Sequence, residues 1–456
     1  MDRINHSDTS GLIGATTAKC VAARQRGLQR KPLVGSYVVL LLFVFICCAR
    51  PQDWIPGLST VPLAKITGIL ALLALLFSLR HIRHRLPREI FLLVLLVGQL
   101  FLAAMMSPVW RGGALQTTLD FAKVLIIVIV MTVAVNTMRR LRLLIVIQAT
   151  SVAVVAASAV LKGRLLVGRL EGVLGGNYSN PNDLALAIII SLPLCVALML
   201  LSKSRLRRVA WALAILVMTY VVFLTGSRGG FIGLIVTAAV LLFEFAIRGR
   251  RRYLLALTAL VAVILWQSSS GMLLARLEGT FDTRDNAASA YSSAQQREQL
   301  FWRSVEVTKE HPLFGIGPGN FEVISGDWRV THNSFTQMSS EGGVPALIFY
   351  LLILWSGFTN SRKTKQWTQG REELGLLARA LQASLAGFVV GSLFSSVAYQ
   401  MFPYFLVAYT TALLLIAKKS VPHLNQLASV SPARSEMESY VDPGYATLSY
   451  EENFRW

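Results

Sequence analysis

Charged residues are scarce in this sequence, at 15% of 456 positions, whereas soluble proteins average about 25%. Hydrophobic residues are abundant, at 54%, against an average of about 45–50%. This balance excludes an intrinsically disordered chain, which has low hydrophobicity and high charge, and it excludes a fibrous protein. It also disfavours a soluble enzyme.

Cysteine is rare too, with four residues, and none lies in the longest polar stretch, residues 268–343. Cys20 belongs to a basic N-terminal tail, and Cys47, Cys48 and Cys195 lie in or beside apolar blocks. We therefore expect neither a structural disulfide nor a metal site of the Cys-x-x-Cys type.

The sequence has instead a series of apolar blocks separated by short basic clusters. A helix needs roughly 20 residues to cross about 30 Å of hydrocarbon, and an isolated strand would leave backbone groups unpaired in lipid. Twelve blocks approach this length: 33–49, 63–79, 90–106, 117–137, 142–161, 184–201, 209–224, 230–247, 253–267, 344–358, 376–397 and 400–417. The first follows a long basic tail and precedes no Ala-x-Ala site, so we do not expect a cleaved signal. The pattern predicts an all-α polytopic membrane protein with about twelve transmembrane helices.

Acidic residues are the scarcer charge, with 24 against 44 Lys and Arg, which gives a net charge of +20. In a soluble protein this excess would suggest nucleic-acid binding. Here the basic residues gather in the N-terminal tail and in alternate connections, at 80–88, 139–142, 203–208, 248–252, 362–371 and 418–419. Basic loops stay in the cytoplasm, so the charge indicates topology, with both termini cytoplasmic, and no nucleic acid is expected as a partner.

This topology divides the chain into five parts. Residues 1–32 form a cytoplasmic tail, 33–267 contain helices 1–9, 268–343 form one large periplasmic loop, 344–417 contain helices 10–12, and 418–456 form a tail predicted to be disordered. The large loop is the only sizeable extracytoplasmic element, so we expect any chemistry on that side to centre there.

The large loop contains two sequences that could carry chemistry. A predicted amphipathic helix ends at Glu310 and precedes HPLFGIGPGNF at 311–321, whose glycines permit a tight turn. The amides of this turn could bind an anion, although a plain interfacial turn is the commoner use of such a sequence. His332 follows in the sequence THNSF. A neutral imidazole can accept a proton from a hydroxyl near pH 7, but a lone loop histidine is more often only a polar surface residue.

Other polar residues are predicted at or near the same membrane surface. Arg228, in the short turn TGSRGGF at 225–231, is either a functional cation, as intramembrane charges often are, or an arginine that reaches headgroup phosphates. Asp120 and Lys123 form a local ion pair, the favoured interpretation, or face a cavity. The 162–183 loop adds GRLEG at 168–172 and NPND at 180–183.

Together these sequences resemble the O-antigen ligase and polymerase superfamily of bacterial inner-membrane proteins. In chain order, the resemblance is carried by SRGG at 227–230, Arg297, HPLFGIGPGNF, His332-Asn333 and Glu341-Gly342-Gly343, across about residues 211–358. GRLEG and NPND look similar too.

The resemblance implies a GT-C-like membrane glycosyltransferase that takes a glycan from an undecaprenyl diphosphate carrier on the outer face of the inner membrane. Ligases pass the glycan to a sugar of the lipid A core, polymerases pass it to another carrier-linked glycan, and the sequence does not choose between these acceptors. No cofactor, nucleotide sugar or metal is expected, and the large loop has no DxD-like pair.

The resemblance also suggests roles for single residues. Arg228 and Arg297 would bind the diphosphate, because the guanidinium fork matches phosphate and keeps its proton. His332 would take the proton of the attacking hydroxyl, and Asn333 or Glu341 could orient it. The other predicted substrate-binding residues are Arg169, Asn182, Arg303 and Asn320.

One departure from the family pattern concerns the loop arginine. The family usually has tryptophan four residues after it, whereas this position is Phe301 here and the tryptophan is Trp302. Arg303 therefore stays an alternative to Arg297, and Arg276 is a further candidate cation.

A twelve-span transporter, such as a flippase for the same lipid carrier, is the competing interpretation. Transporters of this size usually have two similar halves and polar residues at mid-membrane. Here the halves look dissimilar and the polar motifs gather at the predicted outer end, which favours the glycosyltransferase.

Overall fold

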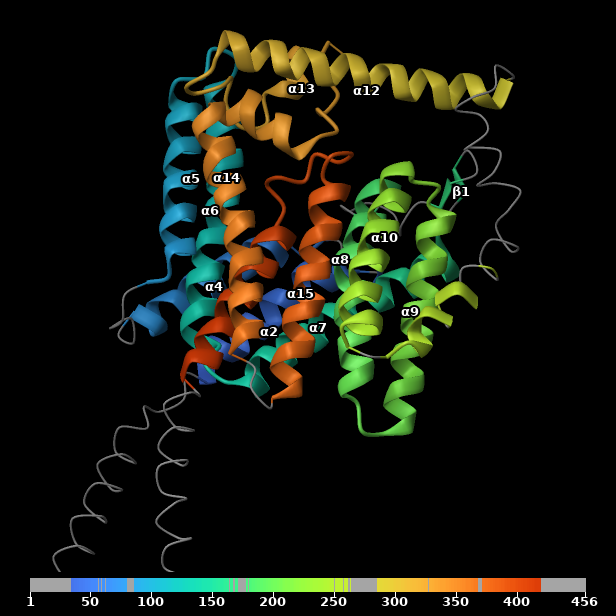
Figure 1. Cartoon of the computed structure of the whole chain (residues 1–456). Coiled ribbons are helices and arrows are strands. Elements are labelled where there is room, and N and C mark those ends of the chain that lie inside the picture. Colours follow the sequence, from blue (N-terminus) through green and yellow to red (C-terminus); the bar gives the residue numbers. More distant parts are fainter. Residues whose placement is uncertain are drawn as a thin grey trace, which may run out of the picture.

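The protein is a bundle of long helices with one further helix, α12 (Asp285–Glu310), lying across one end (Figure 1). This end is called the α12 end below. The computed structural model describes residues 34–55, 57–58, 60–61, 63–79, 86–163, 165–166, 169–170, 178, 180–249, 251–256, 258–260, 263, 285–326, 328–367 and 371–419. The predicted N-terminal tail, nearly all of the C-terminal tail and the first part of the large loop lie outside these residues.

The described chain is helical apart from turns and one very small ribbon. The other helices are α2 (Val34–Ala49), α3 (Pro51–Trp54), α4 (Leu63–Leu79), α5 (Arg88–Met105), α6 (Arg111–Ala134), α7 (Met138–Lys162), α8 (Pro181–Leu201), α9 (Arg205–Leu224), α10 (Arg228–Leu241), which continues as the π-helix η1 (Leu242–Ile247), α13 (Phe321–Ile324), α14 (Ser334–Gln366) and α15 (Glu372–Gly391). Residues 402–419 are also helical, as are the described residues between 253 and 263. The ribbon pairs β1 (Leu165–Leu166) with β2 (Arg169–Leu170) in antiparallel fashion, and the described chain belongs to the all-α class, as predicted.

Eight of the described helices are long and apolar enough to cross a membrane: α5, α6, α7, α8, α9, α10 with η1, α14 and α15. Two shorter apolar helices cover Gly35–Ala49 and Ile66–Leu76. The chain is therefore a multi-pass membrane protein. Apolar side chains face outward along these helices, as lipid requires. Among the eight, α8 is the most enclosed, with 78% of its most apolar 18-residue stretch buried inside the protein.

Two helices differ from the predicted apolar segments, at residues that contact each other. The α14 helix starts at Ser334, before the predicted 344–358 segment, which begins where the helix kinks at Gly343. The Asn333 side chain accepts hydrogen bonds from the Phe335 and Thr336 amides (2.9 and 3.2 Å) and caps the helix. The predicted 376–397 span ends at Gly391. Beyond it the chain unwinds, because the Ser334 amide donates to the Ser392 carbonyl (2.9 Å) and the Ser334 hydroxyl to the Ser395 carbonyl (2.7 Å).

A sharp kink in α14 lets the helix start at the α12 end and then descend through the bundle (Figure 1). The kink is at Gly343, whose φ of 80° and ψ of 171° are not helical. Residues 311–321, called the glycine-rich segment below, pack into it. The Val344 amide donates to the Pro312 carbonyl (2.8 Å), and the amides of Ile316 and Gly317 donate to the Ser340 and Glu341 carbonyls (both 2.9 Å). These amides therefore bind the chain itself, which supports the plain-turn interpretation of this segment.

The α12 helix is held against the bundle by one apolar face. Its buried residues Leu300, Ser304 and Val307 recur at helical spacing, and Leu300 and Val307 form a small apolar cluster with Ile316 and Phe321 of the glycine-rich segment. The α12 helix also contacts α14. This packing fixes which side of α12 faces the bundle.

The opposite end of the bundle contains a buried carboxylate surrounded by cations. Glu244, in η1, is 3% exposed. Its carboxylate pairs with Lys365 of α14 (2.7 Å), Arg248 (3.5 Å) and Arg379 of α15 (3.7 Å). These contacts join α10, α14 and α15 far from the α12 end.

We predict that Gly343→Ala lowers the free energy of unfolding by about 2 kcal/mol or more, because only glycine adopts this backbone conformation readily. A Cβ atom there would also lie 2.4 Å from the Leu313 carbonyl oxygen. The matched control is Gly98→Ala in the middle of α5, where a Cβ meets nothing within 4 Å and alanine favours the helix by roughly 0.5–1 kcal/mol. Thermal unfolding of the purified proteins measures both changes, and equal melting temperatures for the two variants would contradict the prediction.

Candidate functional site

Three helices begin close together at the α12 end, namely α8, α10 and α14. The Ser227 hydroxyl before α10 donates to the Asn182 side-chain oxygen in the first turn of α8 (2.8 Å). The Ser395 hydroxyl donates to Asp183 of α8 (3.2 Å), while the Ser395 carbonyl accepts from the Ser334 hydroxyl of α14. Each helix start carries roughly half a positive charge from aligned peptide dipoles, so their meeting point attracts anions.

Two glycines after Arg228 allow this close approach. A Cβ on Gly229 would lie 2.4 Å from the Phe394 Cβ, and one on Gly230 would lie 2.7 Å from the Ala185 Cβ. The start of α10 is thus packed against both α8 and residues 392–401. These glycines make room for protein neighbours.

Among the three residues predicted to be catalytic, Arg297 lies close enough to both Arg228 and His332 to interact with them electrostatically, although they come from distant segments. Arg228 is the first residue of α10, Arg297 lies on α12, and His332 precedes α14. Burial, followed by the charge of Arg228, lowers the pKa of Arg297. Burial, followed by the charges of Arg297 and Arg329, lowers the pKa of His332 to about 4. Within the described part of the chain, Arg297 has no carboxylate partner.

His332 has a strained backbone as well as a perturbed side chain. Its φ is 52°, in the left-handed region that residues other than glycine rarely adopt. Such strain costs of order 1–3 kcal/mol and persists where the surroundings enforce it, often at functional sites. Neighbouring Thr331 contributes, since its hydroxyl donates to the Asn333 carbonyl and contacts the Ser396 hydroxyl, both at 2.9 Å.

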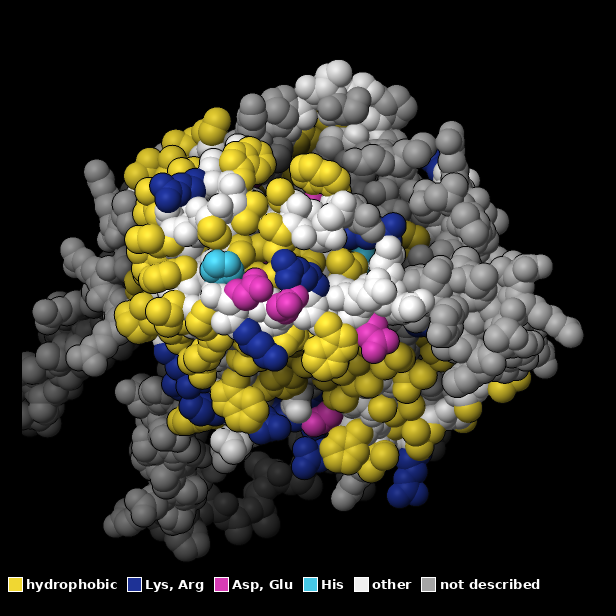
Figure 2. All heavy atoms as spheres, turned by 90° about the horizontal axis from the view of Figure 1, so that it is seen from above, with side chains coloured by type: hydrophobic (Ala, Val, Ile, Leu, Met, Phe, Trp, Pro, Cys, Tyr) yellow, Lys and Arg dark blue, Asp and Glu magenta, His cyan; other side chains and the backbone are white. Residues whose placement is uncertain are grey.

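The two alternative arginines of α12 lie on different faces of the helix. Arg297 is half-buried and falls in register with buried Leu300, Ser304 and Val307. Arg303 is exposed and pairs with Glu306 at 2.5 Å. The spacing of three and four residues along 297, 300, 304 and 307 is visible in the sequence and would have favoured Arg297. Figure 2, which looks onto the α12 end, shows charged side chains of both signs among hydrophobic ones on this surface.

The side-chain amides of three predicted binding residues form hydrogen bonds with other parts of the protein. Asn182 accepts the Ser227 hydroxyl, and Asn333 caps α14. Asn320 is 1% exposed and donates to the Ser107 hydroxyl (2.8 Å) and the Ile316 carbonyl (2.9 Å). These contacts indicate that Asn320 and Asn333 position the backbone. For Arg169 only the backbone, in β2, is described, and Arg276 lies outside the described residues.

Glu341 is buried behind the glycine-rich segment, at 2% exposure. Its carboxylate accepts the Phe321 amide (3.3 Å), interacts with the Gly319 amide and lies beside the Tyr399 hydroxyl. Among the described residues, no hydrogen bond or ion pair joins it to His332. The anion held by the amides of this segment is therefore the protein's own carboxylate.

Sequence reasoning missed Arg329 and the whole 392–401 segment. Arg329 is exposed and three residues before His332, outside every recognised motif. The 392–401 segment was assigned to two spans, although three serines and Tyr399-Gln400 interrupt its apolar character, and that interruption was the available signal. No group of three or more His, Cys, Asp or Glu that could hold a metal occurs in the part of the chain that the structure describes.

Residues 213–351 match the model of the family described as O-Antigen ligase. Over these residues, which are less than half of its length, the chain is similar to this family. The match runs from α9 through α12 into α14 and includes Arg228, Arg297 and His332. This family implies a role in polysaccharide assembly, an enzyme of the ligase or polymerase type, and lipid-linked glycan substrates in general. A comparison with curated proteins found no match.

We predict that Arg297→Gln and Arg329→Gln each raise the pKa of His332 from about 4 toward its ordinary value of 6.5, because each removes a positive charge that opposes protonation. Arg303→Gln, on the exposed face of α12, is the matched control and should leave this pKa unchanged. NMR titration of protein with labelled histidines measures it, with His332→Ala identifying the resonance. If the His332 pKa in all three variants equals the wild-type value, Arg297 and Arg329 do not lie close to His332.

Proposed function

We propose that this protein is a membrane glycosyltransferase that moves a glycan from an undecaprenyl diphosphate carrier to a hydroxyl of an acceptor. The observation that carries the proposal is the meeting of Arg228, Arg297 and His332 at the starts of α8, α10 and α14. Arginine side chains and helix N-termini are both groups that bind phosphate.

The arginines would act on the leaving group. In a direct displacement, the acceptor oxygen bonds to the anomeric carbon of the glycan while the bond from that carbon to the diphosphate oxygen breaks. Negative charge then builds on the diphosphate, and fixed positive groups stabilise that charge more than they stabilise the bound donor. Half-buried Arg297 is well suited, because lower solvent screening strengthens its interaction with phosphate. Displacement in one step inverts the configuration at the anomeric carbon.

His332 would accept the proton of the attacking hydroxyl. With a pKa of about 4, its imidazole is neutral at pH 7 and able to accept a proton, but it is a weak base. The charges of Arg297 and Arg329 contribute to this low pKa, and a bound diphosphate would offset both. Donor binding would therefore raise the pKa of His332 and make it a stronger base once the donor is in place.

The same proposal fixes the topology. The α12 end would face outward, where exported lipid-linked glycans are found, and the basic connections would face the cytoplasm. This arrangement has twelve spans in a GT-C-like fold in the bacterial inner membrane, with both termini in the cytoplasm and residues 268–343 as the large periplasmic element. The acceptor would be a lipid A core sugar for a ligase or a second carrier-linked glycan for a polymerase. Genomic neighbours would separate these two, through a core-oligosaccharide or a polymer-assembly cluster.

A transporter or flippase remains the alternative interpretation. The cations and His332 gather at one end of the bundle, whereas a transport path needs polar groups at mid-membrane. The transfer assay described next distinguishes them, because a transporter would form no new glycosidic bond.

We predict that Arg228→Lys, Arg228→Ala and Arg297→Ala each reduce glycan transfer by about 10²–10³-fold, the usual effect of removing one donor to a developing negative charge. Lysine fails at position 228 because it cannot reproduce the bidentate fork. Arg303→Ala, on the exposed face of α12, should retain activity. The assay uses proteoliposomes with undecaprenyl diphosphate-linked glycan and an acceptor, at matched protein levels. An active Arg297→Ala with an inactive Arg303→Ala would show that the loop arginine is misassigned.

We predict that His332→Ala loses about 10²–10⁴-fold in turnover, the range for general-base catalysis, with donor binding nearly unchanged. His311→Ala, in the turn after α12, is the matched control and should keep most activity. In the wild type, kcat/KM should fall only as the pH drops through about 4, where free His332 becomes protonated. The acid limb of kcat should lie at higher pH, since bound diphosphate favours the imidazolium. Near-normal turnover in His332→Ala would remove histidine from the mechanism.

A further inference from the structure

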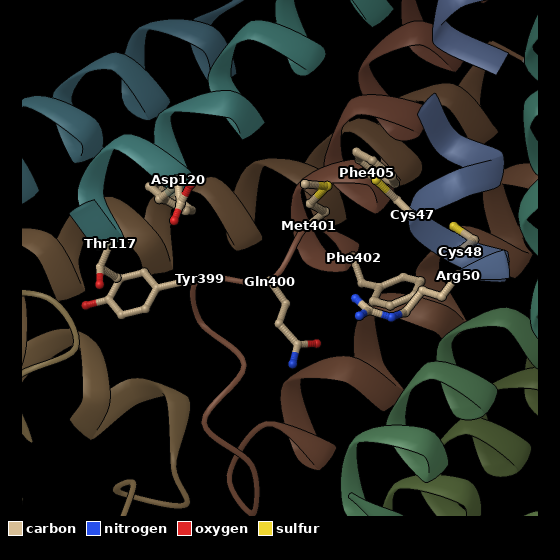
Figure 3. Close-up of a pocket in the computed structure, with 11 residues that line it drawn as sticks. Cys47, Cys48, Arg50, Thr117, Asp120, Tyr399, Gln400, Met401, Phe402 and Phe405 are labelled. Atoms are coloured by element: carbon tan, nitrogen blue, oxygen red, sulfur yellow. The ribbon is translucent and has the colours of Figure 1, made fainter. Parts of the chain in front are cut away.

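A cavity of about 350 Å³ lies between α2, α6 and the 392–401 segment (Figure 3). Its volume falls within the roughly 300–1,000 Å³ of typical small-molecule sites. Thr117 and Asp120 of α6 approach it from one side, and Arg50, after α2, lies near Phe402 on the other (Figure 3). Neither Arg228 nor Arg297, called the arginine cluster below, lines the cavity.

We propose that this cavity binds the hydroxyl-rich sugar of the acceptor. The inference rests on the proposed function, which requires a second substrate beside the lipid-linked donor, and it assigns that substrate a place. The occupant is a neutral saccharide unit that presents its hydroxyl toward the starts of α8, α10 and α14.

The polar lining matches the hydrogen-bonding needs of a sugar. The Asp120 carboxylate accepts, the Gln400 amide donates and accepts, and the Thr117 and Tyr399 hydroxyls do both. Phe402 supplies an apolar surface against which the C–H groups of a sugar ring can pack. A lipid tail would satisfy none of these polar groups and would displace water that hydrates them, which is unfavourable.

The charge of the cavity argues against a diphosphate as its occupant. One cation, Arg50, and one carboxylate, Asp120, line it, so their charges largely cancel. Asp120 is additionally paired with Lys123 in the next turn of α6. Both interpretations of Asp120 in the sequence therefore hold together: it forms the local ion pair and it faces a cavity. An anion would meet the Asp120 carboxylate here, whereas the arginine cluster offers it cations and helix starts.

The 392–401 segment connects the cavity with the donor site. Ser395 and Ser396 contact Asp183 and Thr331 beside the helix starts, while Tyr399 and Gln400 line the cavity. Ser396 and Gln400 are four positions apart, a distance of at most about 14 Å even in a fully extended chain. A saccharide that fills the cavity can therefore reach toward the anomeric carbon of a donor held at Arg228 and Arg297.

Tyr399 also ties the cavity wall to the glycine-rich segment. Its hydroxyl is buried and interacts with the Glu341 carboxylate. A sugar hydroxyl in the cavity can donate to the oxygen of the Tyr399 hydroxyl, which still has a lone pair to accept it.

The test compares the KM values for the two substrates. Asp120→Asn and Gln400→Ala are assayed in proteoliposomes with undecaprenyl diphosphate-linked glycan as donor. Lipid A carrying its core, and separately the lipid-linked glycan itself, serve as acceptors. We expect the acceptor KM to rise about 10-fold or more, as loss of a hydrogen bond to a charged group implies, while the donor KM stays within about 3-fold. Lys123→Gln removes the ion pair but does not line the cavity, and it should match the wild type.

Each other outcome overturns the assignment in a distinct way. A raised donor KM with an unchanged acceptor KM would show that the cavity holds the donor's lipid or its first sugar. Unchanged KM values in both variants would show that neither substrate uses the cavity, and an equal effect of Lys123→Gln would reduce Asp120 to a structural role. Failure of the proposed function is recognised separately, because the wild type itself would then neither transfer glycan nor bind undecaprenyl diphosphate.

Discussion

The backbone hydrogen bonds between the glycine-rich segment and α14, on both sides of Gly343, determine where the candidate site can form. The Pro312 carbonyl takes the amide that the kink releases at Val344, and the Ser340 and Glu341 carbonyls take amides from the segment. A kink without such partners would leave polar groups unpaired at the edge of the lipid, at a cost of several kcal/mol each. With them, the first nine residues of α14 can turn away from the span, bringing His332 and Asn333 to the starts of α8 and α10. The same segment supplies Ile316 and Phe321, the apolar surface on which α12 rests.

That arrangement holds like charges together before any substrate is present. Arg297 lies near Arg228, and the charges of Arg297 and Arg329 both act on His332. Their mutual repulsion must be offset by the packing of α12 and by the capping of α14, because Arg297 has no acidic partner among the described residues. In the proposed function, a ligand with two or more negative charges would relieve this repulsion, and the relief would contribute to its binding free energy. A neutral molecule would gain nothing from it, so the site would favour anions.

Hydropathy and basic clusters were enough to predict a multi-pass helical membrane protein. Lipid requires each span to have a certain length and an apolar composition, and both can be recognised directly in the sequence. The motif resemblance likewise predicted Arg228, Arg297 and His332, which the structure brings together, although their roles stay predictions. The end of α15 and the contribution of Arg329 could not be predicted in this way. The end of α15 depends on a partner 61 residues away in the sequence, since the Ser334 hydroxyl donates to the Ser395 carbonyl. The contribution of Arg329 depends on a loop fold that brings this arginine close to His332. Asn320 and Glu341 show the converse, since both belong to the resemblance and both turn inward to hold the scaffold.

The ion-pair cluster around Glu244 restricts the relative movement of three helices whose other ends form the candidate site. It clamps α10, α14 and α15 together where their basic ends meet, and the far ends of these three helices carry Arg228, Ser334 and the 392–401 segment. Because α10, α14 and α15 are held together at both ends, tilt or rotation of one helix is resisted by the other two. Removing one partner of a buried ion pair leaves an uncompensated charge and costs about 3–5 kcal/mol. Loosening at Glu244 would therefore change the distances among the candidate site residues at the other end of these helices, so the accuracy of the proposed chemistry would depend partly on a carboxylate far from the site.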